Sequence, residues 1–136
     1  MVCIYCGSET KVANSRLQKK ANQVWRRRAC TSCGAVFTTL EAVEASQALQ
    51  VRRGKRSESF SRDTLLLSIY DSLKHRKTAI TDATALTGTI LSNLYPLIHE
   101  ATLERDDMVD IAAKTLRRFD PIAATHYQAF HPTAKN

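Results

Sequence analysis

The sequence predicts an α+β protein, in which a small β-rich domain that binds a metal precedes a larger, mainly helical domain that begins with a β-hairpin. Three observations support this fold class. All four cysteines of the 136-residue chain fall within its first 33 residues. Residues with high strand propensity surround them, whereas apolar residues recur at helical spacing beyond residue 60. We therefore expect two domains, over residues 1–46 and 47–136.

The cysteines form two pairs with the same spacing, Cys3-x-x-Cys6 and Cys30-x-x-Cys33. Each such turn places two sulfur atoms on one edge of a tetrahedron, and two turns complete the ligand set of a closed structural zinc site. An iron–sulfur cluster and a pair of redox motifs are the alternatives, although a redox Cys-x-x-Cys is typical of a βαβ unit. We expect one structural Zn²⁺, with no open position for catalysis, bound by Cys3, Cys6, Cys30 and Cys33.

The segments around the second cysteine pair predict a β-hairpin. Val24–Arg28 and Val36–Leu40 are rich in strand-forming residues and flank the turn that carries this pair. A glycine directly follows each pair, at Gly7 and Gly34, where a positive φ lets backbone amides turn toward a thiolate. The second pair is therefore expected on a hairpin, with the first pair brought to it from the N-terminus.

The second domain is expected to begin with a hairpin over Ala48–Phe60, in which two short extended runs surround Gly54. A first helix follows Ser61, because serine side chains accept hydrogen bonds from the first turn of a helix. A second helix is expected to open at Thr81–Asp82 and to end or kink at Pro96.

Two further helices complete this domain. One is expected to begin near Asp106–Asp107, because acidic residues suit the positive end of a helix. A short last helix is expected after Asp120–Pro121, a pair typical of a cap followed by a first turn. The apolar positions of the four helices are Leu65, Leu66, Ile69, Tyr70, Leu73, Leu86, Ile90, Leu94, Leu97, Val109, Ala112, Leu116, Phe119, Tyr127 and Phe130.

The chain contains 20 Lys and Arg against 13 Asp and Glu, a formal charge of +7 that fits either a polyanionic partner or simple solubility. The distribution is more informative, because seven cations and no acidic residue lie between Glu9 and Glu41. A zinc–thiolate site contributes a charge of about −2. Binding to a polyanion must therefore depend on where the cations lie.

Three consecutive arginines lie on the predicted strand before the second cysteine pair. Because side chains alternate along a strand, Arg26 and Arg28 share one face, and Trp25 and Arg27 share the other. An arginine fork suits a phosphate or a guanine edge, and a strand pair fits the major groove. A solvated run of charge is the alternative. We expect binding of double-stranded DNA by these arginines and by cations of the first loop: Lys11, Arg16, Arg26, Arg27 and Arg28.

Several classes of protein are excluded. No apolar run approaches the ~18 residues that cross a bilayer, and Met1–Cys6 lacks the features of a signal peptide. The four histidines are scattered without the spacing of a catalytic motif. We therefore expect no membrane partner, no enzymatic activity, and a cytoplasmic, nucleoid-associated location.

The cysteine pairs belong to a longer combination of short motifs. These are Cys3-x-x-Cys6-Gly7, Thr10-Lys11-Val12, Asn14-Ser15-Arg16, Arg26-Arg27-Arg28, Cys30-x-x-Cys33-Gly34 and Phe37-Thr38-Thr39-x-Glu41. Together they resemble the NrdR family, the bacterial transcriptional repressors of ribonucleotide reductase genes. In that family a zinc ribbon precedes an ATP-cone, a helical nucleotide-sensing domain that begins with a hairpin. The resemblance implies a zinc-dependent repressor that binds operator DNA, and a homo-oligomer whose state responds to ATP or dATP.

The second domain resembles the ATP-cone at its hairpin. Val51-Arg52-Arg53 is similar to the family's Val-Lys-Arg, and Glu58-x-Phe60 matches its Glu-x-Phe. The resemblance implies an allosteric site for an adenine nucleotide, in which a basic hairpin lies over the phosphates and guanidinium groups pair with phosphate oxygens. The expected nucleotide-binding residues are Val51, Arg52, Arg53, Lys55, Arg56, Glu58, Phe60 and Arg76.

A second function fits the same sequence. In this alternative, the zinc ribbon docks on a protein partner, and a degenerate cone no longer senses nucleotide, since Thr64 stands where the family has a lysine. Binding to duplex DNA that falls steeply with salt would favour the repressor.

Overall fold

A computed structural model describes residues 1–133, apart from the side chain of Ser46. The chain divides into two compact units, Met1–Val43 and Glu44–Asn136. The first is a β-sheet that carries the cysteines, and the second is mainly helical, which confirms the α+β class. The predicted second domain runs to residue 136, and its last three residues lie outside the described part. No helix within residues 1–133 has the length and hydropathy needed to cross a membrane.

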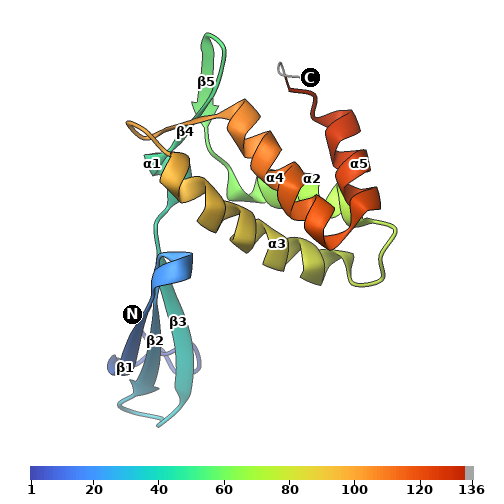
Figure 1. Ribbon diagram of the computed structural model, residues 1–136. Coiled ribbons are helices and arrows are strands. Elements are labelled where there is room, and N and C mark those ends of the chain that lie inside the picture. Colours follow the sequence, from blue (N-terminus) through green and yellow to red (C-terminus); the bar gives the residue numbers. More distant parts are fainter. Residues whose placement is uncertain (134–136) are drawn as a thin grey trace. The chain divides into compact units, whose positions relative to one another are not determined.

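The first unit is a three-stranded antiparallel sheet of β1 (Thr10–Gln18), β2 (Gln23–Cys30) and β3 (Val36–Ala42), in the order β1-β2-β3 (Figure 1). A short 3₁₀ turn, Lys19–Ala21, joins β1 to β2 and ends at Asn22, whose φ is 47°. The predicted hairpin of β2 and β3 is confirmed, and both strands extend beyond their expected ends.

The expectation that Lys11 and Arg16 lie in a loop was wrong, because both belong to β1. Nearly every side chain of β1 is exposed, so this strand shows no alternation of apolar and polar residues. Its backbone is held by pairing with β2 instead of by burial. Hydrophobic periodicity, the main signal of a strand, was therefore missing from this segment.

The second unit begins with a short helix, α1 (Ala45–Ala48), followed by the predicted hairpin of β4 (Gln50–Arg53) and β5 (Arg56–Ser59). Gly54 turns this hairpin with a φ of +59°, a conformation that glycine adopts at little cost. A three-residue strand, β6 (Thr102–Glu104), pairs in parallel with β4, so the sheet order is β5-β4-β6. No sequence pattern predicted β6, because a strand of three residues is too short to show a period.

Four helices follow, as predicted: α2 (Arg62–Leu73), α3 (Ala79–Leu94), α4 (Arg105–Phe119) and α5 (Pro121–Phe130). The Ser61 side chain caps α2 by accepting from the Thr64 N–H. The predicted start of α3 at Thr81 was two residues late, because Asp82 lies in the first turn and accepts from the Thr78 hydroxyl. Pro96 lies in a 3₁₀ turn directly after α3, which confirms its role as a terminator.

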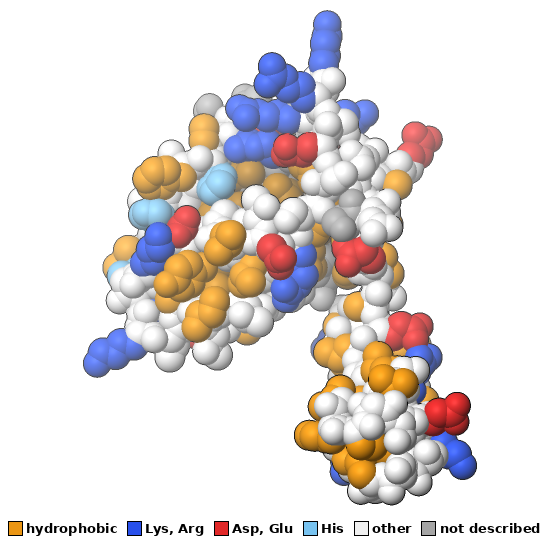
Figure 2. All heavy atoms as spheres, turned by 180° about the vertical axis from the view of Figure 1, so that it is seen from behind, with side chains coloured by type: hydrophobic (Ala, Val, Ile, Leu, Met, Phe, Trp, Pro, Cys, Tyr) orange, Lys and Arg blue, Asp and Glu red, His pale blue; other side chains and the backbone are white. Residues whose placement is uncertain are grey.

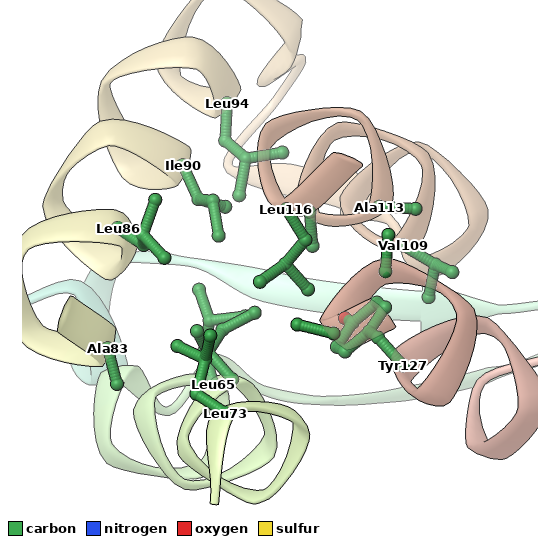
Figure 3. Packing of buried hydrophobic residues seen from close by; sticks show 14 of the residues in the cluster. Leu65, Leu73, Ala83, Leu86, Ile90, Leu94, Val109, Ala113, Leu116 and Tyr127 are labelled. Atoms are coloured by element: carbon green, nitrogen blue, oxygen red, sulfur yellow. The ribbon is translucent and has the colours of Figure 1, made fainter. Parts of the chain in front are cut away.

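The predicted apolar stripes of α2, α3 and α4 and the tyrosine of α5 meet in one core (Figure 3). Each fully buried aliphatic side chain contributes about 1.5–3 kcal/mol to folding. For three expected core residues the prediction was wrong, because Leu97, Phe119 and Phe130 are 37%, 43% and 70% exposed and lie outside the core. The hairpin contributes Val51 and Phe60 to the same core, which ties the candidate nucleotide site to the rigid part of the unit.

Candidate functional sites

The four cysteine sulfurs form one cluster at the end of the first unit, with all Sγ atoms within 4.8 Å of one another. The Cys3 and Cys33 sulfurs are 3.7 Å apart, and the Cys6 and Cys30 sulfurs are 3.5 Å apart. A tetrahedral Zn²⁺ with Zn–S bonds of ~2.3 Å requires sulfur–sulfur edges of ~3.8 Å. The cluster therefore fits one closed four-thiolate zinc site, as the cysteine spacing predicted.

Backbone amides of the two cysteine turns stabilise negative charge on the sulfurs. The Tyr5 N–H donates to Cys3 Sγ, and the Ser32 and Cys33 N–H groups donate to Cys30 Sγ, each at 3.4 Å. The last two bonds lower the pKa of the Cys30 thiol. Gly7 and Gly34 have φ values of +72° and +70°, so both turns adopt the conformation predicted from their glycines.

Neighbouring groups shift the pKa values of the Cys6 and Cys33 thiols in opposite directions. Hydrogen bonds from the Ser8 side chain and backbone lower the pKa of the Cys6 thiol to about 6. At Cys33, a bond from the Ala35 N–H opposes the effect of the neighbouring Cys6 and Cys30 sulfurs, which raise the pKa of that thiol to about 12. A bound dication would favour the thiolate form of all four sulfurs.

The strand register divides the five predicted DNA-binding residues between the two faces of the sheet. Residues paired directly across antiparallel strands point to the same face. Arg16 lies opposite Trp25, and Lys11 lies opposite Ala29. Arg27 is two residues from both Trp25 and Ala29 along β2, so its side chain points to the same face as theirs. Lys11, Arg16 and Arg27 therefore share one face, which we call the cationic face, and all three are exposed.

The other two arginines of the triplet point to the opposite face and are held by neighbouring side chains. Arg26 forms an ion pair with Glu41 of β3. The Arg28 guanidinium donates to the hydroxyls of Thr39, at 3.3 Å, and Thr10, at 3.4 Å. Both arginines are half-buried, so their guanidinium groups fasten the three strands to one another. For these two residues, as for Lys11, Arg16 and Arg27, DNA binding stays a prediction.

Most of the predicted nucleotide-binding residues line two hollows beside the hairpin. Arg52 and Arg53 line a cleft of about 500 Å³, which we call the charged cleft. Val51, Glu58 and Phe60 line a hollow of about 290 Å³, which we call the inner pocket. Lys55 and Arg56 are exposed at the hairpin turn. Figure 2 shows Lys and Arg side chains gathered at the end of the helical unit from which this hairpin projects.

Arg76 lies elsewhere, between α2 and α3, and lines neither hollow. Its guanidinium donates to Asp82 at 2.9 Å and to Asp120 at 3.3 Å. It also lies over the Phe119 ring, 4.8 Å from the centroid. The structure thus shows Arg76 joining three helices, and its contact with a nucleotide stays a prediction.

Several lining residues were not among the predicted set, because only tertiary structure brings them to the hairpin. Arg105, the first residue of α4, lines both hollows. Thr133 lines the charged cleft, and Tyr127 and His131 line the inner pocket. Burial and the nearby Arg105 charge both lower the pKa of His131, so the field of this arginine reaches into the inner pocket.

Comparison with known proteins identifies relatives over the whole chain. Residues 1–41 match the family model "Transcriptional repressor NrdR-like, N-terminal domain". A protein of Hyphomonas neptunium named Transcriptional repressor NrdR is 30% identical over 137 residues, a match that covers 100% of this chain and 86% of the relative. A protein of the same name from Afipia carboxidovorans is 30% identical over 132 residues, covering 96% of this chain and 83% of the relative.

The chain joins a four-cysteine site on an antiparallel sheet to a helical unit, and it matches these relatives. These observations define its class as a transcriptional repressor with a zinc ribbon. The relatives' name, Transcriptional repressor NrdR, also confirms the prediction that the protein is a regulator and not an enzyme. The match to the Hyphomonas neptunium protein extends through both units. The chain belongs to the NrdR family.

Proposed function

We propose that this chain is a zinc-dependent repressor that binds double-stranded DNA through its sheet and responds to ATP or dATP bound by its helical unit. The name that the relatives share, Transcriptional repressor NrdR, supports the repressor role. The family resemblance adds ribonucleotide reductase genes as the target, the ATP-cone as the identity of the helical unit, and a homo-oligomer as the responding assembly.

The cationic face is the single observation that carries DNA binding. Lys11, Arg16 and Arg27 come from two strands, yet the register places them on one exposed surface. A two-stranded ribbon fits the major groove, and cations spread along it neutralise phosphates. Trp25 and Arg16 also border a hollow of about 270 Å³ on this part of the sheet, which offers a base or a sugar an apolar contact.

Replacement Arg27→Ala is expected to weaken DNA binding about tenfold, because one charge-assisted contact to phosphate is lost. The salt dependence of the association constant should become shallower by about one phosphate contact. The measurement is a titration of labelled operator duplex at several salt concentrations. Arg118→Ala, which removes an exposed arginine of the helical unit, is the matched control.

Two outcomes of this titration would contradict the proposal. Equal affinity of wild type and Arg27→Ala at each salt concentration would remove the cationic face from the interface. Wild-type binding that does not fall with salt would instead favour the alternative, in which the zinc ribbon docks on a protein.

The positions of the hairpin residues support the proposal of a nucleotide site. Arg52 and Arg53 offer guanidinium groups to phosphates in the charged cleft, while Val51 and Phe60 give the inner pocket an apolar wall. The two hollows share Arg105 as a lining residue, and an elongated ligand would place one end in each. An anionic end and an apolar end in continuity match the chemistry of an adenine nucleotide.

Replacement Arg53→Ala is expected to weaken ATP and dATP binding about tenfold or more, because the ligand loses a charged donor. Calorimetry with each nucleotide measures the affinity, and particle mass recorded in each state tests the oligomeric response. Arg118→Ala should bind like the wild type. A wild-type protein that gives no heat and no change of mass with either nucleotide would be a DNA-binding protein without a sensor.

A further inference from the structure

Arg105 forms part of the wall of both the charged cleft and the inner pocket. It is the first residue of α4 and lines both hollows. Its side chain, stem included, is 16% exposed. It donates from Nη1 to the Pro132 carbonyl at 3.0 Å and lies 3.8 Å from the Asp106 carboxylate.

The guanidinium group has hydrogen-bonding capacity that these contacts do not use. An arginine carries five N–H donors in a rigid fork, which suits two oxygens of one phosphate. Within residues 1–133, the bond to Pro132 uses one of those donors. Glu104, the nearest carboxylate in sequence on the other side, accepts from Arg52 at 2.6 Å. A ligand in the cleft therefore finds Arg105 with most of its donors available.

Thr133 supplies an independent sign that the cleft holds a ligand. This residue lines the charged cleft and is 8% exposed. Its Oγ1 is buried and has no hydrogen-bond partner among residues 1–133. Buried hydroxyl groups are almost always paired, so this one lacks a partner that a ligand oxygen in the adjacent cleft would supply after a rotation about χ1 of Thr133.

The backbone of α4 adds to the attraction for an anion. The first N–H groups of a helix have no intrahelical partner, and together with the helix dipole they favour negative charge. Glu104, at the N-cap of this 15-residue helix, makes no side-chain cap bond. Asp106 and Asp107 also border the cleft, so the anion must be placed by directed bonds, not by net charge.

We propose that Arg105 and Thr133 bind a phosphate group of the nucleotide, Arg105 through its fork and Thr133 through its hydroxyl. This inference rests on the proposed nucleotide site and deepens it. Arg105 then marks the joint of the ligand, with the phosphates in the charged cleft and the nucleoside in the inner pocket. Its role is to select nucleotides over nucleosides.

The test compares ligands with and without phosphate. Arg105→Ala is expected to weaken ATP about 10- to 100-fold, the loss of charge-assisted hydrogen bonds, and to leave adenosine unchanged. Affinities are measured by displacement of a fluorescent ATP analogue, with ATP, adenosine and inorganic tripolyphosphate as competitors. Arg105→Lys should retain part of the ATP affinity, and Arg118→Ala should retain all of it. If Arg105 only fastens Pro132, Arg105→Ala will weaken ATP and adenosine equally, which overturns the proposal.

Thr133→Val gives a second test, which can be carried out even if the affinity for adenosine is too weak to measure. It removes a buried hydroxyl without a protein partner at nearly constant volume, so the melting temperature should stay equal or rise. ATP affinity should fall about fivefold, the effect of one lost hydrogen bond. Unchanged ATP affinity would exclude Thr133 from the site. A wild type that binds no ATP refutes the proposed function itself, whereas a binding wild type with an equally tight Arg105→Ala refutes only this inference.

Discussion

Removal of zinc is expected to unfold the unit Met1–Val43 and to leave the helical unit folded. Among the described residues of the first unit, only Cys3 and Cys30 are buried, so the metal ligands take the place of an apolar core. A domain of this size rarely gains enough stability from burial alone. Structural zinc sites contribute apparent free energies of ~10–16 kcal/mol in zinc-finger peptides. Burial of apolar side chains in a domain of this size cannot make up for the loss of that free energy.

The chain offers a separate signal for each unit. Trp25, its single tryptophan, lies on β2 and reports the zinc-bound sheet by fluorescence. The long helices α2 to α5 all lie in the other unit, so circular dichroism at 222 nm reports that unit. A strong chelator should therefore shift Trp25 emission to the red and preserve most of the helical signal.

A matched variant separates loss of metal from other effects of a chelator. Cys33→Ser should show the same red-shifted emission without any chelator, because three thiolates no longer complete the tetrahedral site. Metal analysis of each sample records the zinc content. Metal-free protein with unchanged Trp25 emission would show that the sheet is stable by itself, and the structural role of zinc would then be refuted.

The cysteine cluster could be predicted because the information for each of its two halves is local. Two Cys-x-x-Cys turns with a following glycine specify ligand, geometry and backbone conformation within a few residues of each other. The division of the arginines could be predicted only in part. Alternation along β2 separates Arg27 from its two neighbours, but the pairing of β1 with β2, which adds Lys11 and Arg16 to the face of Arg27, requires the register.

The helices could be predicted because one side of each is buried, which leaves a period of apolar residues such as Leu65, Ile69 and Leu73 in α2. The margins of the proposed nucleotide site carry no such period of apolar residues. Arg105 and Thr133 reach the hairpin through the packing of α4 and the chain after α5, and neither residue stands out among its neighbours in sequence. Sites assembled from distant segments therefore become visible only in three dimensions.

Replacement Asp120→Ala is expected to cause a large loss of stability in the helical unit. Asp120 is 8% exposed and ends α4 where α5 begins. Its Oδ1 accepts from the Ile122 and Ala123 N–H groups, at 3.0 and 3.2 Å, and so caps α5. Its Oδ2 accepts from His75 Nε2 at 2.9 Å and also from Arg76. One carboxylate thus joins the start of α5 to the segment after α2.

Loss of the cap and of the bonds to His75 and Arg76 should lower the free energy of unfolding by about 3 kcal/mol. Asp120→Asn keeps a good capping side chain and removes the charge, so it should cost about half as much. Urea unfolding followed at 222 nm measures both differences. Equal losses for the two variants would mean that the cap contributes nothing.

The pH dependence of the free energy of unfolding identifies the part of the Asp120 contribution that comes from the carboxylate charge. The hydrogen bond from His75, together with the bonds from the α5 amides, lowers the pKa of Asp120. A lowered pKa means that the contribution is complete above the unfolded value of about 4 and is lost as the pH falls through the folded value. The difference in stability between wild type and Asp120→Asn should therefore shrink as the pH falls below about 4. A difference that persists in acid would assign the effect to packing, because a protonated carboxyl and an amide place the same charge beside His75 and Arg76.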